Sequence, residues 1–315
     1  MASPQVICFG EIVSDRRVSA VGDSSDAPGG APVYVAFGLT KLSTSAALIG
    51  AVGDDAAGQG LVAQLGQAGI DLSGFQQHPT APTRVVTRDS QGQVLSWGEG
   101  EPAHCADAQL QAAALSEASF AAADYLLLGT SALAYPDSAA ALARALELAD
   151  ETCTKIFLDV QWQPGHWPDP EAAKAQIRAL MGQVDFLQLS PSEAEWLLDT
   201  TDAAGILAQL DQLEGVFVVD PDQGVGYALL AGPRGQIPAF KVPVLDLAGA
   251  GEAFAAAVLS QLVTNSLQRL MDESFVAGMV RYASAASSLA VTGMGAIAPQ
   301  ASDAEIQAFL VGRVE

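Results

Sequence analysis

The chain has 315 residues, a length that suits one large α/β domain and is ample for a buried core. Its net charge is −22, from 14 Lys and Arg against 36 Asp and Glu, so we expect neither nucleic acid nor an anionic membrane as a partner. The three cysteines and three histidines are scattered and no apolar run approaches a membrane span, which predicts a cytoplasmic protein without a disulfide framework or a zinc site.

Strands and helices are predicted to alternate along the chain. In chain order, buried strands are predicted at 6–9, 46–52, 125–128, 155–160, 186–189 and 216–219, and a strand at 226–230 that pairs back after a tight turn. Helices are predicted at 33–42, 58–68, 108–122, 137–149, 171–181, 192–198, 252–262, 273–291 and 303–312. This order is typical of an α/β fold with a mostly parallel sheet covered on both faces, and the absence of repeats predicts a single domain over 1–315.

A small β lid is predicted beside this domain. Residues 16–28 are polar and irregular by pattern, whereas 83–87 and 93–97 are predicted to form a hairpin around the turn at 89–92. We expect a lid formed by about 13–27 and 79–103, because a lone hairpin must cover a site or pair with another copy of the chain. Trp97 on this lid could stack on a ligand or be buried in a dimer interface.

The stretch 245–262 carries the strongest candidate for chemistry. Gly249, Ala250 and Gly251 form a bare turn before a helix, whose first N–H groups make an anion site. Glu252 lies in the first turn of that helix, where its carboxylate could deprotonate a hydroxyl that attacks phosphorus. The alternative is an ordinary turn before a helix with an N-terminal Glu, and a short glycine motif alone favours that alternative.

Three other positions stand where binding residues are common. Asp15 follows the first strand, where an open α/β sheet binds its ligands, although a loop aspartate is an equal explanation. Gly29 and Gly30 precede the helix at 33–42 and allow a ligand close to the backbone. Ser190 is a candidate N-cap with Glu193 as its capping-box partner.

Taken together, these motifs resemble those of the PfkB (ribokinase-like) sugar kinases, and most closely those of the bacterial and plant fructokinases. The segments that carry the resemblance are GEIVSD at 10–15, GGAPVYVAFGLTKL at 29–42, IGAVGDDAAGQGL at 49–61, HPTAPTR at 78–84, LDVQWQPGHWPDP at 158–170, DFLQLSPSEAEWL at 185–197 and LDLAGAGEAF at 245–254. The resemblance implies a ribokinase-like three-layer sandwich with a β lid. It also implies transfer of the ATP γ-phosphoryl group to a sugar hydroxymethyl group, with Mg²⁺ and in many members K⁺.

The resemblance further implies roles for individual residues. It assigns the base to Glu252, with Gly249, Ala250 and Gly251 as the anion hole, and the binding of a fructose-like sugar to Asp15, Gly29, Gly30, Tyr34, Arg84 and Gln161. It assigns nucleotide binding to Ser190, Val219, Asp220, Gly224 and Gly295, and contact with Mg²⁺ through water to Glu193. In the family the lid closes over the sugar and often builds a homodimer.

Several positions depart from the family pattern. Glu252 stands where the family has Asp, and Tyr34 and Gln161 each stand where it has Asn. Val219 lacks a threonine hydroxyl, and Pro221 lacks a backbone N–H in the turn that approaches the nucleotide phosphates. Each change alters a contact that the resemblance would otherwise predict.

Glutamine also replaces three family cations, at Gln163, Gln188 and Gln223. Phosphoryl transfer depends on positioning and charge neutralisation, so these losses predict weakened or lost catalysis. One alternative is an active sugar kinase that uses Glu252 as its base, with the substrate specificity shifted by Tyr34 and Gln161. An alternative of another class is a pseudokinase that binds an unknown protein partner.

Overall fold

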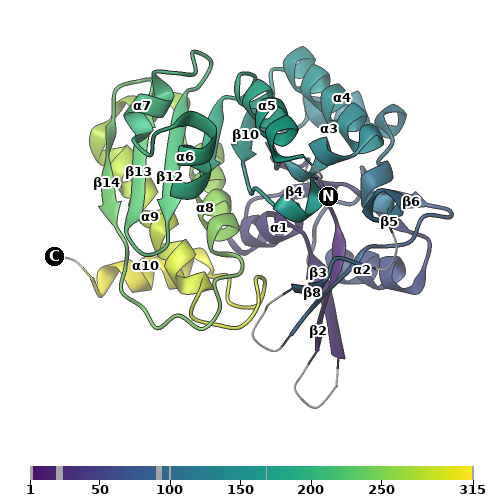
Figure 1. The fold of residues 1–315 in the computed structure, drawn as a ribbon. Helices are drawn as coiled ribbons and strands as arrows, with labels where there is room; N and C mark the ends of the chain where they lie inside the picture. Colours follow the sequence, from purple (N-terminus) through teal and green to yellow (C-terminus); the bar gives the residue numbers. More distant parts are fainter. Residues whose placement is uncertain (1–2, 19–23, 90–93, 99–100, 168, 314–315) are drawn as a thin grey trace.

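The computed structural model describes residues 3–18, 24–89, 94–98, 101–167 and 169–313. At its centre is an eight-stranded sheet with the order β14-β13-β12-β11-β10-β9-β1-β4 (Figure 1). Its strands are β1 (Val6–Phe9), β4 (Ala46–Ile49), β9 (Tyr125–Leu128), β10 (Lys155–Asp159), β11 (Phe186–Leu189), β12 (Gly215–Asp220), β13 (Gly224–Leu229) and β14 (Arg234–Pro238). The pairs from β4 to β12 are parallel and the last two are antiparallel, which confirms the mostly parallel sheet.

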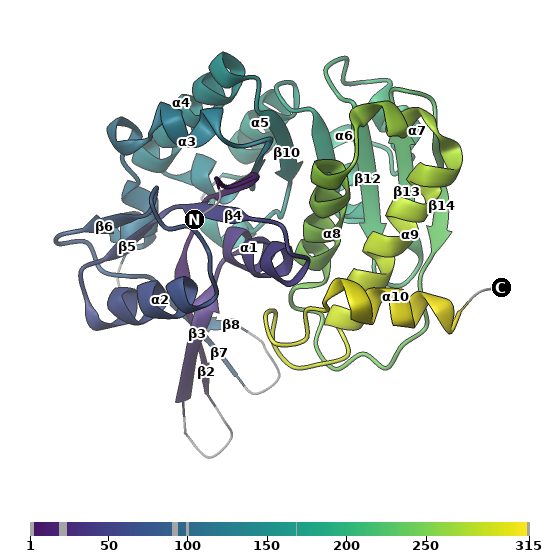
Figure 2. The same cartoon turned by 180° about the vertical axis from the view of Figure 1, so that it is seen from behind.

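Helices cover both faces of this sheet and give the predicted three layers. On one face, seen from the front in Figure 2, lie α1 (Ala31–Lys41), α8 (Ala250–Thr264), α9 (Glu273–Ala290) and α10 (Asp303–Val311), together with α2 (Ala56–Gln67). The other face carries α3 (Glu117–Ala121), α4 (Pro136–Thr152), α5 (Pro170–Met181), α6 (Pro191–Leu198) and α7 (Ala203–Leu207). Each face has its own core because strands in a parallel sheet are buried on both sides.

A four-stranded sheet projects from this body in Figure 1 and has the order β3-β2-β7-β8. Its strands are β2 (Val13–Val18), β3 (Ser24–Gly29), β7 (Val85–Arg88) and β8 (Val94–Ser96). The irregular chain predicted at 16–28 is therefore wrong for most of its length, because β2 pairs antiparallel with β3 and parallel with β7. The hairpin of β7 and β8 is not isolated either, because β7 also pairs with β2. The turn of this hairpin, at 90–93, lies outside the described residues, as do 19–23 and 99–100.

The long helix predicted at 108–122 is also wrong. The chain there forms short 3-10 turns at Ala106–Gln109 and Ala112–Ala114 before the five-residue α3. Leu110 is extended and buried, and Asp107 pairs with the buried Arg84. These tertiary contacts outweigh the helix propensity of the alanines.

Other differences are smaller. The strand predicted at 46–52 is divided into β4 and β5 (Ala51–Gly53), and the pattern did not indicate β14, α7 or β6 (Gln76–His78). Four further 3-10 turns lie at Pro102–His104, Ser131–Ala134, Pro164–His166 and Leu267–Met271. None of the described helices combines the length and the apolar character that a bilayer crossing requires.

Candidate active site

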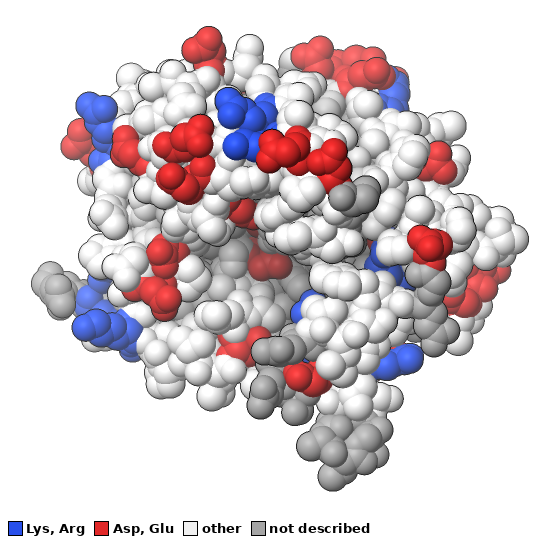
Figure 3. Space-filling model, in the orientation of Figure 1, with Lys and Arg blue, Asp and Glu red and all other residues white. Residues whose placement is uncertain are grey.

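A cavity of about 200 Å³ lies between the four-stranded sheet and the carboxyl ends of β1 and β10. Figure 3 shows a hollow on this face, with acidic side chains inside it. Seven of the residues predicted for catalysis or sugar binding line this cavity: Asp15, Gly30, Tyr34, Arg84, Gln161, Gly249 and Glu252. The structure therefore brings together segments that are far apart in the sequence.

The glycine turn before α8 has the predicted form. Gly249 has a φ of 85°, in the left-handed region that favours glycine, and a Cβ there would lie 2.8 Å from the Cα of Ala296. Ala250 begins α8 and Glu252 is its first-turn acid. The turn thus places the N-terminus of a 15-residue helix, with the Glu252 carboxylate in its first turn, beside the cavity.

Burial raises the pKa of Glu252, and the nearby Glu11 raises it further. A hydrogen bond from the backbone, one from Gln161 and the charge of Arg88 all oppose this rise. A carboxylate with a raised pKa is a stronger proton acceptor, which is the property that a general base needs.

Asp159 lies beside Glu252 at the end of β10. Its pKa is raised well above 3.8 by burial first and then by the charges of Glu252 and Glu193. The folded protein therefore holds this proton to a higher pH than the unfolded chain does. The stability that the protonated form contributes is complete below the unfolded pKa and is lost as the pH rises through the folded one.

We expect the substitution Asp159→Asn, which removes the ionisation, to flatten this loss. As the pH rises from about 4, the ordinary pKa of an aspartate, towards neutrality, the unfolding free energy of the variant should fall less than that of the wild type, as measured by urea unfolding. Asp150→Asn, at an exposed position on α4, is the matched control and should keep the wild-type slope. Equal slopes in the wild type and Asp159→Asn would show that Asp159 does not ionise in this range.

Asp15 stands on the lid side of the cavity with two partners. The Tyr34 hydroxyl donates to its Oδ2 at 3.1 Å, and Arg88 Nε donates to the same oxygen at 3.2 Å. Gly29 is adjacent, since a Cβ there would lie 3.0 Å from the Cβ of Asp15. Burial and Asp15 both raise the pKa of Tyr34, so its hydroxyl remains a donor. A hydroxyl ligand must therefore share Asp15 with Tyr34 and Arg88.

Arg84 is in the wall of the cavity with its charge already balanced. It is 1% exposed, and its Nε contacts Asp107 Oδ2 at 2.8 Å. Its Nη2 donates to the carbonyl of Pro102. These contacts give Arg84 a structural role in addition to the predicted role in binding sugar.

Two charged residues of the cavity were missed from the sequence. Glu11 accepts a hydrogen bond from the backbone N–H of Ala31 at 3.1 Å and another from the Ser131 hydroxyl. Arg88 pairs with Asp15 from β7. Glu11 follows strand β1 directly and could have been proposed on the same grounds as Asp15, whereas no local pattern indicated Arg88.

The residues predicted to bind nucleotide lie outside this cavity's lining. Ser190 caps α6, and Val219 and Asp220 end β12. Oδ1 of Asp220 accepts from the N–H groups of residues 222 and 223, and Gly224 then begins β13. The structure therefore places them at the carboxyl ends of strands β11 and β12.

Gly295 lies on the other side of the glycine turn and is tied to the lid. Its N–H donates to Asp246 Oδ2 at 2.9 Å, and Arg17 Nη2 on β2 contacts the same oxygen at 2.7 Å. The N–H of Ala248 donates to Asp246 Oδ1. Asp246 thus connects the lid, the glycine turn and the Gly295 loop, and Arg17 balances its charge beside the loop to which the resemblance assigns nucleotide binding.

Carboxylates suited to a hydrated Mg²⁺ lie near the turn, although no cluster of three metal-binding side chains is formed by the described residues. Glu193 accepts from the N–H of Trp162 at 2.6 Å and from the N–H and hydroxyl of Ser190 at 2.7 and 2.8 Å. Mg²⁺ commonly keeps several waters and uses one or two carboxylates plus phosphates, so Glu193 and Asp159 fit such an ion through water.

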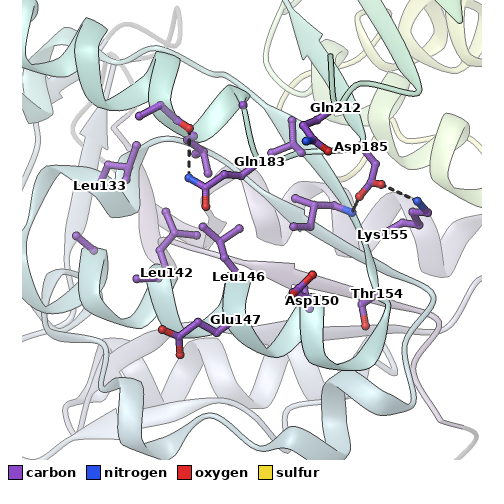
Figure 4. Close-up of a pocket in the computed structure, with 18 of the residues that line it drawn as sticks. Leu133, Leu142, Leu146, Glu147, Asp150, Thr154, Lys155, Gln183, Asp185 and Gln212 are labelled. Atoms are coloured by element: carbon purple, nitrogen blue, oxygen red, sulfur yellow. Dashed lines mark hydrogen bonds and ion pairs between the residues drawn. The ribbon is translucent and has the colours of Figure 1, made fainter. Parts of the chain in front are cut away.

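A larger cavity of about 960 Å³ lies at the opposite end of the strands, where β10 and β11 begin (Figure 4). Lys155, which begins β10, contacts Asp185 there at 2.7 Å, whereas the candidate site lies beyond Asp159 at the other end of the same strand. Open α/β sheets bind substrates at the carboxyl ends of their strands, so the smaller cavity is the candidate active site.

A model of the pfkB family carbohydrate kinases matches residues 4–303. The chain belongs to this family. Fructokinase-1 of Zea mays is 29% identical over 313 residues, which cover 96% of this chain and 96% of the maize protein. Fructokinase-1 of Oryza sativa subsp. japonica is 29% identical over 316 residues, covering 96% and 97%. Within the pfkB family, the chain thus fits the fructokinase branch.

Solved structures confirm the ribokinase-like fold. The fructokinase from Xylella fastidiosa with bound ATP matches with a TM-score of 0.89 at 24% identity, covering 98% of this chain and 99% of that one. A fructokinase from Vibrio cholerae O395, in a form with fructose, ADP and potassium ion bound, gives 0.87 at 24% identity with the same coverage. The aminoimidazole riboside kinase from Salmonella enterica gives 0.81 at 19% identity, covering 97% and 99%.

Proposed function

We propose that this pfkB-family protein phosphorylates a hydroxymethyl group of a fructose-like sugar with ATP, more slowly than relatives with a full set of active-site cations. The observation that carries the proposal is the position of Glu252, which lines the same cavity as Asp15 and stands at the start of α8. A sugar hydroxyl bound there would lie between a proton acceptor and an anion-binding helix end.

The nucleotide is assigned to the side of the turn away from the sugar cavity. Val219, Asp220 and Gly224 would face it from the β12–β13 turn, and Gly295 from the opposite loop. Mg²⁺, when bound, would neutralise phosphate charge, with Glu193 holding it through water. Slow turnover is expected because Gln188, buried at the turn, supplies a neutral amide where charge would be more effective.

A coupled assay of fructose phosphorylation with Mg-ATP and K⁺ tests this proposal. We expect measurable turnover below the usual kinase range of about 1–100 per second. Thermal unfolding with each ligand separates binding from chemistry, because a ligand at one hundred times its Kd adds about 2.7 kcal/mol of stability. The absence of both turnover and stabilisation by fructose or Mg-ATP would contradict the proposal.

The contacts of Asp15 favour a second candidate, a pseudokinase that binds a protein partner. Tyr34 and Arg88 already hydrogen-bond Oδ2 of the carboxylate that the proposal assigns to sugar, which leaves Oδ1 for the ligand. Stabilisation by neither ligand, with no turnover on any sugar tested, is the result that this candidate predicts. In both cases the four-stranded sheet is proposed as the surface of a homodimer, because β3 and β8 are its edge strands.

A further inference from the structure

Two glutamines flank a buried aspartate directly behind the glycine turn. Gln161 Nε2 donates to Asp159 Oδ2 at 2.7 Å, and Gln188 Nε2 donates to the carbonyl of Gly251 at 2.9 Å. Asp159 is 6% exposed and Gln188 is 2% exposed, so these polar groups are removed from water. Asp159 and Gln188 are paired residues on the adjacent strands β10 and β11, so the Gln188 bond joins this end of the sheet to the first turn of α8.

Gln161 adopts an unusual backbone conformation to take part in this network. Its φ is 45°, in the left-handed region that residues with a side chain rarely adopt. The conformation turns the chain sharply after β10, so that the amide reaches back to Asp159 two residues earlier. Such strained residues gather at functional sites, where the surrounding structure holds them in place.

Gln161 lines the same cavity as Glu252, and its amide lowers the pKa of the Glu252 carboxyl, as a nearby donor does. A glutamine amide has two N–H donors, so one group can hold two carboxylates that would otherwise repel each other. The groups that act on Glu252 electrostatically come from several elements: Glu11 after β1, Arg88 on β7, Tyr34 on α1 and Asp159 on β10. Gln161 adds a neutral amide donor to this set of groups.

We propose that the Gln161 amide, oriented by Asp159, donates its second N–H to Glu252 and is a positioning residue for the base, while Gln188 fixes the first turn of α8 to the sheet. This inference rests on the proposed function, since it takes Glu252 as the base. It differs from the role in sugar binding that the resemblance implied, because the Gln161 amide donors are used on carboxylates of the protein.

Kinetics of Gln161→Leu test the proposal. We expect kcat to fall by about tenfold to a hundredfold while KM for the sugar changes little, because a misplaced base lowers the rate of chemistry. We also expect the acidic limb of the kcat profile to move to higher pH, because the variant lacks a donor that stabilises the charged form of Glu252. Gln161→Asn keeps the amide and should recover part of both effects, and the exposed Gln176→Leu should change neither.

A double-mutant cycle in urea unfolding, with Gln161→Leu, Glu252→Gln and their combination, supplies a readout that does not need activity. We expect the two sites to be coupled by about threefold or more in the unfolding equilibrium constant. If the wild type phosphorylates no sugar, the proposed function fails and this cycle alone decides whether Gln161 holds Glu252. Additive single effects, or a rise in KM with kcat and the pH profile unchanged, would overturn the proposal.

Discussion

Glu252→Gln is expected to lower kcat by about 100- to 10,000-fold, the range that general acid–base catalysis contributes. The amide keeps the size of the side chain at the start of α8 but cannot accept the proton of the sugar hydroxyl. The effect should be large because Glu252 lies in the cavity with a pKa raised by burial. The coupled phosphorylation assay measures it directly.

Glu195→Gln, at an exposed position on α6, is the matched control for this change and should keep wild-type turnover. Thermal stabilisation by fructose should survive in Glu252→Gln, because the contacts at Asp15 are unchanged. A variant that retains most of its kcat would show that the proton is removed by another group or directly by solvent.

Arg84→Leu is expected to destabilise the fold by about 3–5 kcal/mol, because it leaves Asp107 buried without its partner. The two side chains are 1% and 2% exposed and meet at 2.8 Å. Burial raises the pKa of Asp107 and Arg84 opposes that rise, so the substitution removes both the charge and the hydrogen bond that favour the ionised carboxylate. Urea unfolding at neutral pH measures the difference.

Two further variants define the origin of this cost. Arg84→Leu combined with Asp107→Leu should recover much of the stability, because paired removal leaves no buried charge. Arg16→Leu breaks an exposed pair with Asp26, at 41% and 39% exposure, and should cost less than about 1 kcal/mol. A single Arg84→Leu effect as small as that of Arg16→Leu would contradict a structural role for the buried pair.

The sequence predicted the parts of the fold that are encoded locally. The apolar runs of the parallel strands, Gly249 before α8 and the Ser190–Glu193 capping box all depend on neighbours within a few residues. The helix at 108–122 was predicted in error because the burial of Leu110 and the pair of Asp107 with Arg84 are contacts of distant chain segments. Local propensity carries no signal for such contacts.

The candidate site was predicted in the same uneven way. Resemblance indicated Asp15, Tyr34 and Glu252, which the structure places around one cavity. It did not indicate Arg88, which reaches Asp15 only after β7 pairs with β2. Nor did it indicate that the Gln161 amide would bind the Asp159 carboxylate, because that depends on a left-handed φ at a residue with a side chain.

The most direct test of Glu252 as a working base is the turnover of fructose with Mg-ATP by the wild type beside Glu252→Asp. If Gln161 and its partners position the longer side chain, shortening it by one methylene should lower kcat by about a hundredfold, the cost of a displacement of about 1 Å. A silent wild type that gains activity in Glu252→Asp would contradict this, because it would show that the glutamate is misplaced and that only the base had been lost.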